Sequence, residues 1–138
     1  MASKRTILAL DVGEKRIGVA IADTSVMIAI AYETLLVDGS ERDELSKLIQ
    51  SEAVDQLVIG YPRNQSGEPT AQTQYVEEFA ETLSFLDVPI DFQDESLTSV
   101  KAEELLKAQK RPYEKAEVDS LAASLILQDY LEAKHGRI

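Results

Sequence analysis

Two short apolar segments near the start of the chain, separated only by residues 13–16 (GEKR), constrain the fold most strongly. Residues 6–12 read TILALDV, and residues 17–23 read IGVAIAD. Runs this short and this apolar predict strands that are buried on both faces of a sheet. The brief connection predicts that the two strands are antiparallel neighbours. A third apolar segment, residues 28–37, would complete an antiparallel meander.

The remaining segments alternate between helical and strand patterns. We expect a helix over residues 40–52, because Leu45, Leu48 and Ile49 form an apolar stripe and Ser40 gives a capping-box-like start. Further elements are expected as a strand at 56–59, a helix at 70–84, a strand at 88–93, a helix from 98 or 99 to 108, and a helix at 118–134. This order predicts an α/β fold, in which a three-stranded antiparallel meander plus parallel strands form a mixed five-stranded sheet flanked by helices. The length of 138 residues predicts one domain over 1–138.

Composition excludes several classes of protein and site. The absence of cysteine rules out disulfides and thiolate metal ligands. No apolar stretch approaches the length of about 18 residues that would predict a membrane span, so we expect a cytoplasmic protein with no membrane partner. The formal charge of −11 lacks the basic excess of a typical nucleic-acid-binding protein. Such a chain can still bind phosphates if its cations cluster and metal ions occupy its acidic site.

Asp11 is the first candidate functional residue. It interrupts an apolar strand just before Gly13, where a carboxylate is costly to bury unless it is paired or binds a cation. The alternative is an aspartate that caps the following turn. The spacing from Asp11 through Gly13 to Gly18 is also similar to the phosphate loop of actin-like and sugar-kinase ATPases. Those ATPases need two such domains around a cleft, which this length does not provide.

Glu95 and Asp119 are the other candidate acidic residues. Glu95 follows the strand at 88–93, at a strand end where sheet-based sites gather ligands, and Asp94 is its rival. Asp119 is expected in the first turn of the last helix, facing inward because positions 122, 123 and 126 are apolar. No lysine or arginine follows it at helical spacing until Lys134, so a metal is a good candidate partner. The alternative is an aspartate that stabilises the helix N-terminus.

Three carboxylates from a first strand, a later strand end and a helix start fit two-metal phosphodiester cleavage. Oxygen ligands suit Mg²⁺ or Mn²⁺, and two ions about 4 Å apart would stabilise the attacking and leaving oxygens. Basic side chains would hold the phosphates of a nucleic-acid strand, with Tyr113 available for base stacking. The candidates for this role are Lys15, Arg16, Arg63, Lys107, Lys110, Arg111 and Lys115.

Four segments together resemble the RuvX (YqgF) family of pre-16S ribosomal RNA nucleases, which are related to the RuvC Holliday-junction resolvases. These segments are residues 10–20 (LDVGEKRIGVA), 58–72 (VIGYPRNQSGEPTAQ), 94–99 (DESLTS) and 118–131 (VDSLAASLILQDYL). The resemblance implies a ribonuclease H-like fold with acidic positions at Asp11, Glu95 and Asp119. Two features depart from the family pattern: Ser96 stands where an arginine is usual, and the turn at 65–67 lacks the usual Met-Asp-Gly type sequence. Arg63 could replace the missing charge.

The resemblance implies a hydrolase that processes the 5′ end of pre-16S rRNA during ribosome maturation, as a monomer or homodimer. In this interpretation Asp11 holds the metal ions, and Glu95 and Asp119 complete their ligands. One alternative is the resolution of branched DNA by a dimer that presents two sites. Another is a ribosome-binding module with the fold but little catalysis. A nucleotide-binding ATPase fragment ranks last because of the chain length.

Overall fold

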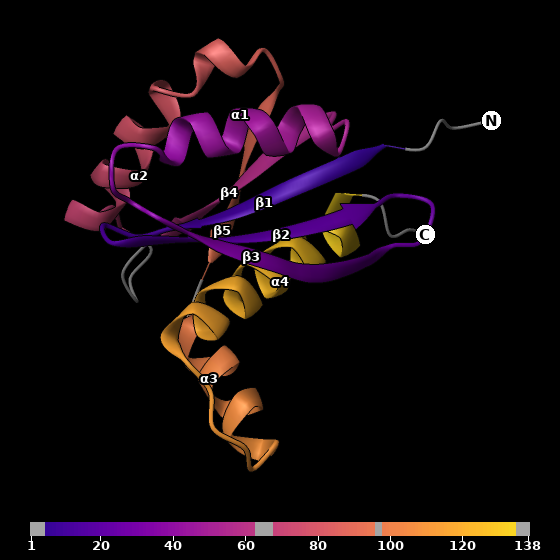
Figure 1. Cartoon of the computed structure of the whole chain (residues 1–138), viewed down its shortest axis with the longest axis vertical. Helices are drawn as coiled ribbons and strands as arrows, with labels where there is room; N and C mark the ends of the chain where they lie inside the picture. The colour runs from indigo at the N-terminus through magenta and orange to yellow at the C-terminus, as the bar shows by residue number, and fades with distance from the viewer. Residues whose placement is uncertain (1–4, 63–67, 96–97, 135–138) are drawn as a thin grey trace.

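The computed structural model describes residues 5–62, 68–95 and 98–134, and its elements follow the predicted order (Figure 1). The strands are β1 (Thr6–Val12), β2 (Arg16–Asp23), β3 (Ile28–Leu36), β4 (Gln56–Pro62) and β5 (Ile90–Glu95). The helices are α1 (Glu41–Ser51), α2 (Ala71–Glu81), α3 (Thr98–Ala108) and α4 (Lys115–Lys134), with a short 3₁₀ turn at Ser84–Leu86.

All five strands form one mixed sheet in the order β3-β2-β1-β4-β5. The first three strands make the predicted antiparallel meander, while β4 lies parallel to both β1 and β5. The carboxyl ends of β1, β4 and β5 therefore lie at the same edge of the sheet. This topology brings the end of β1, which carries Asp11, toward the end of β5, which carries Glu95.

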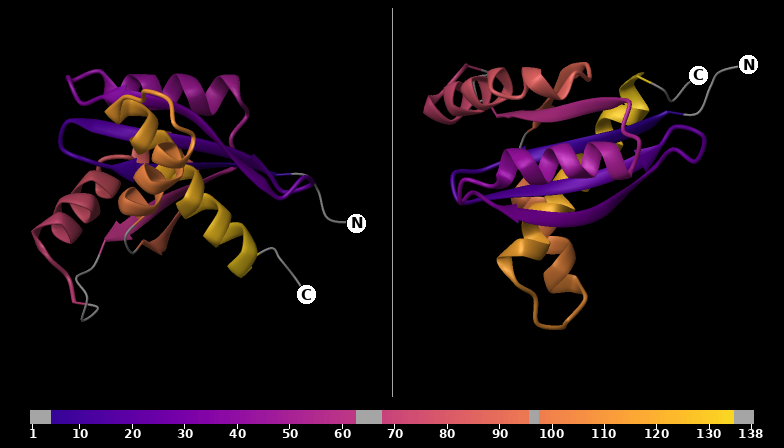
Figure 2. Two further views of the ribbon diagram at one scale, coloured as in Figure 1. Left: turned by 90° about the horizontal axis from the view of Figure 1, so that it is seen from below. Right: turned by 45° about the horizontal axis from the view of Figure 1, so that its top comes forward.

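Helices cover both faces of the sheet, which explains why the central strands are apolar at nearly every position (Figures 1 and 2). Leu8 and Leu10 of β1 join a core that includes residues of α1 and α2. Ile7 and Ala9 point to the opposite face and pack with residues of α4. Helix α3 instead projects away from the sheet, and the loop after it returns the chain to α4 (Figure 1).

Several element boundaries differ from the predicted ones. The ladder between β4 and β5 continues to the pair Pro62–Glu95, so both strands end later than the sequence suggested. Helix α2 ends at Glu81, before the predicted residue 84. Helix α4 begins at Lys115 rather than at residue 118, because Lys115, Ala116 and Glu117 are good helix formers. The prediction that Asp119 lies in the first turn is therefore wrong, since that turn contains Glu117.

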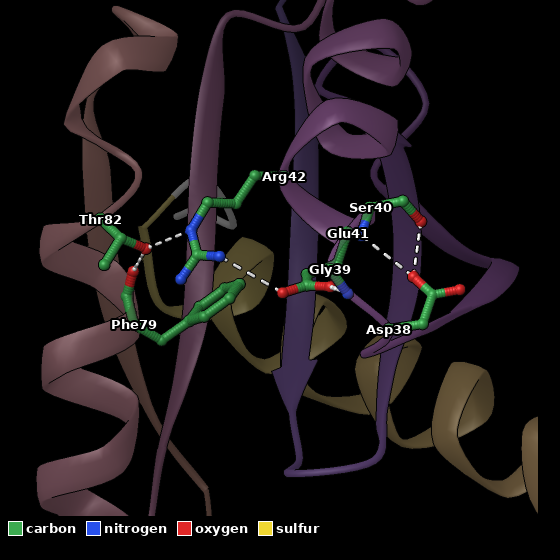
Figure 3. A network of polar contacts seen from close by, with 7 residues as sticks. All are labelled: Asp38, Gly39, Ser40, Glu41, Arg42, Phe79 and Thr82. Carbon is green, nitrogen blue, oxygen red and sulfur yellow. Dashed lines mark hydrogen bonds and ion pairs between the residues drawn. The ribbon is translucent and has the colours of Figure 1, made fainter.

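The start of α1 uses different contacts from those predicted. Ser40 occupies the capping position, but its hydroxyl donates to Asp38 at 2.6 Å instead of capping the helix (Figure 3). Glu41 is buried, accepts from the backbone N–H of Gly39, and pairs with Arg42 at 3.3 Å. Arg42 also donates to Thr82, just beyond α2. These contacts hold α1 beside α2 on one face of the sheet. Within the ranges given above, no helix is long and apolar enough to cross a membrane.

Candidate functional site

Asp11 stands near the end of β1, in the middle of the sheet. Its backbone pairs with Gly18 of β2, and its partly buried side chain lies in an otherwise apolar strand. Burial raises the pKa of the Asp11 carboxyl to about 8, and the nearby charges of Glu95 and Asp119 contribute to this rise. Asp11 thus has the electrostatic character of a group that needs a cation to ionise near neutral pH.

Glu95 is the last residue of β5, which is separated from β1 by β4 in the sheet. Its side chain lines the same pocket as Asp11. A side chain at Gly60 of β4 would lie within 3.2 Å of the Glu95 carboxylate, so glycine leaves the space that this side chain uses. Adjacent strand residues point to opposite faces. The neighbouring Asp94 is exposed, whereas Glu95 lines a pocket together with Asp11.

Asp119 approaches from α4, which packs very closely against β2. A Cβ atom at Gly18 would lie 1.9 Å from the backbone oxygen of Asp119, so only glycine permits this approach. The small residues after Asp119 have the same effect on the helix side, and Ala122 and Ala123 are fully buried. The inward direction predicted from helical spacing is confirmed.

The partner of Asp119 in this structure is an arginine from another element. Arg16, the first residue of β2, donates from Nε to Asp119 Oδ2 at 2.5 Å, across 103 residues of sequence. A metal was predicted as the partner because no lysine or arginine follows Asp119 at helical spacing before Lys134. Arg16 itself was expected to bind phosphate, but here it neutralises a carboxylate of the acidic site.

The three carboxylates line one pocket of about 270 Å³ at the end of the sheet. Its other lining residues are Val12, Gly13, Arg16 and Gln72. Gln72 lies in α2 and donates from its amide to the backbone oxygen of Val12 at 3.0 Å. No role for Gln72 was predicted from the sequence, although the second family-like segment ends at this residue. Its contact with β1 depends on how α2 packs, which helical periodicity alone does not show.

The predicted basic residues do not all gather at this pocket. Lys15 lines an adjoining hollow of about 340 Å³, together with Gly13, Glu14, Arg16, Gln72 and Asp119. Lys110 and Arg111 lie in the loop that follows the projecting α3, and Arg111 pairs with Glu117 at 2.7 Å. Tyr113 lines a separate hollow of about 290 Å³ near this loop. Arg63 and Ser96 lie outside the residues that the structure describes.

The donor set of the pocket suits a hard divalent cation, because every candidate ligand is a carboxylate oxygen. Within 5–62, 68–95 and 98–134, no three Asp, Glu, His or Cys side chains are grouped closely enough to hold one ion by themselves. Mg²⁺ commonly needs only one or two protein carboxylates and takes its other ligands from water and substrate phosphates. The pocket therefore fits such an ion, with Asp11 as the carboxylate most in need of it.

Comparison with known proteins agrees with this architecture. A family model named RuvX and described as Holliday junction resolvase matches residues 5–133. A candidate pre-16S rRNA nuclease of Chloroflexus aurantiacus is 45% identical over 133 residues, covering 93% of this chain and 87% of the relative. A protein of the same name from Synechocystis is 37% identical over 143 residues, covering 100% and 94%.

Solved structures show the same fold. Thermus thermophilus RuvC in complex with a Holliday junction substrate superposes with a TM-score of 0.55 and 14% identity, over 96% of both chains. A second structure of Thermus thermophilus RuvC gives a TM-score of 0.51. The predicted ribonuclease H-like fold is therefore confirmed. Because the family model and the relatives cover nearly all of the sequence, this chain belongs to the RuvX family.

Proposed function

We propose that this protein is a metal-dependent nuclease that hydrolyses phosphodiester bonds and processes the 5′ end of pre-16S rRNA in the cytoplasm. The observation that carries the proposal is the convergence of Asp11, Glu95 and Asp119 on one pocket, where the pKa of Asp11 rises to about 8. The names of the RuvX relatives support ribosomal RNA as the substrate.

In this proposal Asp11, Glu95 and Asp119 hold Mg²⁺ or Mn²⁺, with two ions as the expected number. Bound ions of this kind stabilise the charge that develops on the attacking and leaving oxygens of a phosphodiester. The backbone of Asp11 is fixed by β2, and the neighbouring residue Leu10 also pairs with β4. The Asp11 carboxylate is therefore held on a rigid strand, which suits a group that must be positioned accurately.

The same proposal assigns strand binding to basic residues around the pocket and on the projecting loop. Lys15 and Arg16 adjoin the carboxylates, so they would contact phosphates next to the cleaved bond. Lys110 and Arg111 lie on the loop after α3, so they would contact a more distant part of the strand. Arg63, which follows the last residue of β4 in the sequence, is proposed for the same role.

A second candidate substrate is branched DNA. The description of the family model and the shared fold with a junction-bound RuvC favour this alternative. It would favour a homodimer that presents two acidic pockets to one junction, whereas RNA processing is compatible with a monomer or a homodimer. A ribosome-binding module without catalysis is the third reading, and it predicts binding without metal-dependent cleavage.

Incubation of the protein with labelled pre-16S leader RNA and with a four-way DNA junction, with and without Mn²⁺, tests these proposals. We expect Mn²⁺-dependent cleavage of the RNA, reduced by about 100-fold or more in Asp11→Asn. Asp43→Asn is the matched control, because Asp43 is an exposed aspartate on α1. Cleavage of the junction alone would favour branched DNA, and equal activity of Asp11→Asn and wild type would refute the metal site.

A further inference from the structure

Arg16 lies where two hollows meet, and it lines both of them. In the acidic pocket its Nε contacts Asp119 at 2.5 Å, so it neutralises one of the three proposed metal ligands. On its other side is the hollow lined by Lys15 and Glu14, where Lys15 supplies a second positive charge beside Arg16. A divalent cation that binds Asp119 would compete with Arg16 for the same carboxylate.

The backbone around this contact leaves little freedom for either chain segment to move. The turn before β2 is closed by a hydrogen bond from the Gly13 N–H to the Arg16 oxygen at 3.0 Å. Arg16 also pairs with Leu36 of β3 in the sheet. Helix α4 is fixed against β2 because its backbone at Asp119 fills the space beside Gly18. Any exchange must therefore occur through rotation of the Arg16 side chain.

The side chain has both the room and the chemistry for that rotation. The hollow beside it measures about 340 Å³, and the Arg16 side chain is 31% exposed, so water already reaches it. A guanidinium presents paired donors that match a phosphate group. Lys15 lines the same hollow and would add a second positive charge beside that phosphate.

We propose that Arg16 is an exchangeable counter-ion that couples metal binding to strand binding. In the absence of metal it neutralises Asp119; when a divalent cation binds the acidic pocket, Arg16 is released and turns into the adjoining hollow to bind a phosphate of the nucleic-acid strand. The inference rests on the metal site of the proposed function and adds an order of events to it. Because coupling between two sites is reciprocal, strand binding also strengthens metal binding.

Calorimetric titration of metal-free protein with Mn²⁺ tests the first half of the exchange. Arg16→Ala removes the competitor, so we expect it to bind Mn²⁺ about fivefold or more tightly than wild type. Lys15→Ala is the matched control, since it removes the same charge from the neighbouring residue. We expect Lys15→Ala to change Mn²⁺ affinity by less than about twofold, because among the described residues the ion pair with Asp119 is made by Arg16 and not by Lys15, whose charge is screened by solvent.

Fluorescence polarisation with a short labelled RNA tests the second half. The affinity for RNA is measured at 4 °C, with and without Mn²⁺, on RNA shown to remain intact. We expect Mn²⁺ to strengthen RNA binding by wild type and by Lys15→Ala, but not by Arg16→Ala. If Arg16→Ala loses cooperative unfolding, Arg16→Gln replaces it, since the glutamine amide is a neutral donor. The NMR resonances of arginine Nε–H groups report on the Arg16–Asp119 contact directly. In wild type, one of these resonances should shift when Mg²⁺ is added.

Each outcome separates the exchange from the nuclease proposal. Equal tightening of Mn²⁺ binding by Arg16→Ala and Lys15→Ala, or no tightening by Arg16→Ala, overturns the exchange even if wild type cleaves RNA. Tighter Mn²⁺ binding by Arg16→Ala without any cleavage by wild type supports the exchange and refutes the nuclease. Absence of Mn²⁺ binding in every variant refutes both.

Discussion

Two arginine–carboxylate pairs with similar distances lie in very different parts of the molecule. Arg16 and Asp119, 2.5 Å apart, join β2 to α4 across 103 residues, and their side chains are only 31% and 21% exposed. Arg111 and Glu117, 2.7 Å apart, are six residues apart in the segment after α3, and their side chains are 47% and 41% exposed. The first pair connects two elements, whereas the second orders one local segment.

The two pairs lie in different electrostatic surroundings, which shift the pKa values of nearby carboxylates in opposite directions. The pKa of Glu117 is lowered, chiefly by its hydrogen bond from Arg111, so this carboxylate is readily ionised. The pKa of Asp11 is raised, chiefly by burial and further by the nearby charges of Glu95 and Asp119. The exposed pair thus favours an ionised carboxylate, whereas the burial of Asp11 beside Glu95 and Asp119 disfavours one. A cation bound in the acidic pocket would favour the ionised form of Asp11.

The largest effect on stability should follow from adding a side chain at Gly18, where β2 and α4 are in close contact. Gly18→Ala would place a Cβ atom 1.9 Å from the backbone oxygen of Asp119, and backbone atoms on both sides cannot yield easily. We expect a loss of about 3 kcal/mol in the free energy of unfolding, measured by urea denaturation. Gly60→Ala is the control, because its closest contact is the movable end of Ile126, at 2.7 Å. Equal losses would show that α4 adapts more readily than the close approach implies.

The next effect concerns pH and distinguishes the acidic pocket from the projecting segment. The folded-state pKa of Asp11 is about 8, whereas an unfolded aspartate titrates near 4. Between these values the folded protein binds a proton that the unfolded chain has lost, so the stability of metal-free protein should fall as pH rises from about 4 to about 8. Asp11→Asn removes this dependence and should be more stable than wild type at pH 9 by a margin on the order of 2 kcal/mol.

Urea denaturation in the presence of a chelator, repeated across this pH range, measures the difference. The advantage of Asp11→Asn should shrink as pH falls toward 4. In a second series without chelator, Mg²⁺ at pH 9 should stabilise wild type more than the variant. Asp43→Asn, which lies outside the pocket, should follow the wild-type curve. A constant difference between Asp11→Asn and wild type at all pH values would show that Asp11 does not titrate abnormally.

The smallest effects compare the two arginine pairs directly. Arg16→Ala should lower the free energy of unfolding of metal-free protein by about 1 kcal/mol, because a partly buried charge-assisted hydrogen bond is lost. Arg111→Ala should leave the denaturation midpoint unchanged within error, because its pair with Glu117 is exposed and screened by solvent. A larger loss in Arg111→Ala than in Arg16→Ala would reverse the comparison and show that the projecting segment is ordered by its ion pair.

Much of the fold was accessible from local patterns. The central strands are apolar on consecutive residues because Leu8 and Leu10 face one helical layer while Ile7 and Ala9 face the other. The inward direction of Asp119 followed from the apolar positions one and two turns after it. The convergence of Asp11 and Glu95 followed from their places at strand ends. These features depend on periodicity and element order, which a sequence displays directly.

The tertiary structure decided how the acidic site is neutralised and which other residues surround it. Arg16 and Asp119 meet for two reasons: the pairing of β2 with β1 fixes the position of Arg16, and Gly18 lets α4 approach β2 closely. Neither contact can be predicted from the spacing of residues along a helix. Gln72 reaches β1 only through the packing of α2, and Arg111 lies on the loop after the projecting α3 rather than at the pocket. By itself the sequence determined that Asp11 lies at a strand end and Asp119 on the inner side of a helix, whereas at the second strand end it left Asp94 as the rival of Glu95. The partners of these carboxylates required contacts between distant segments, because the relative placement of packed elements depends on the whole fold.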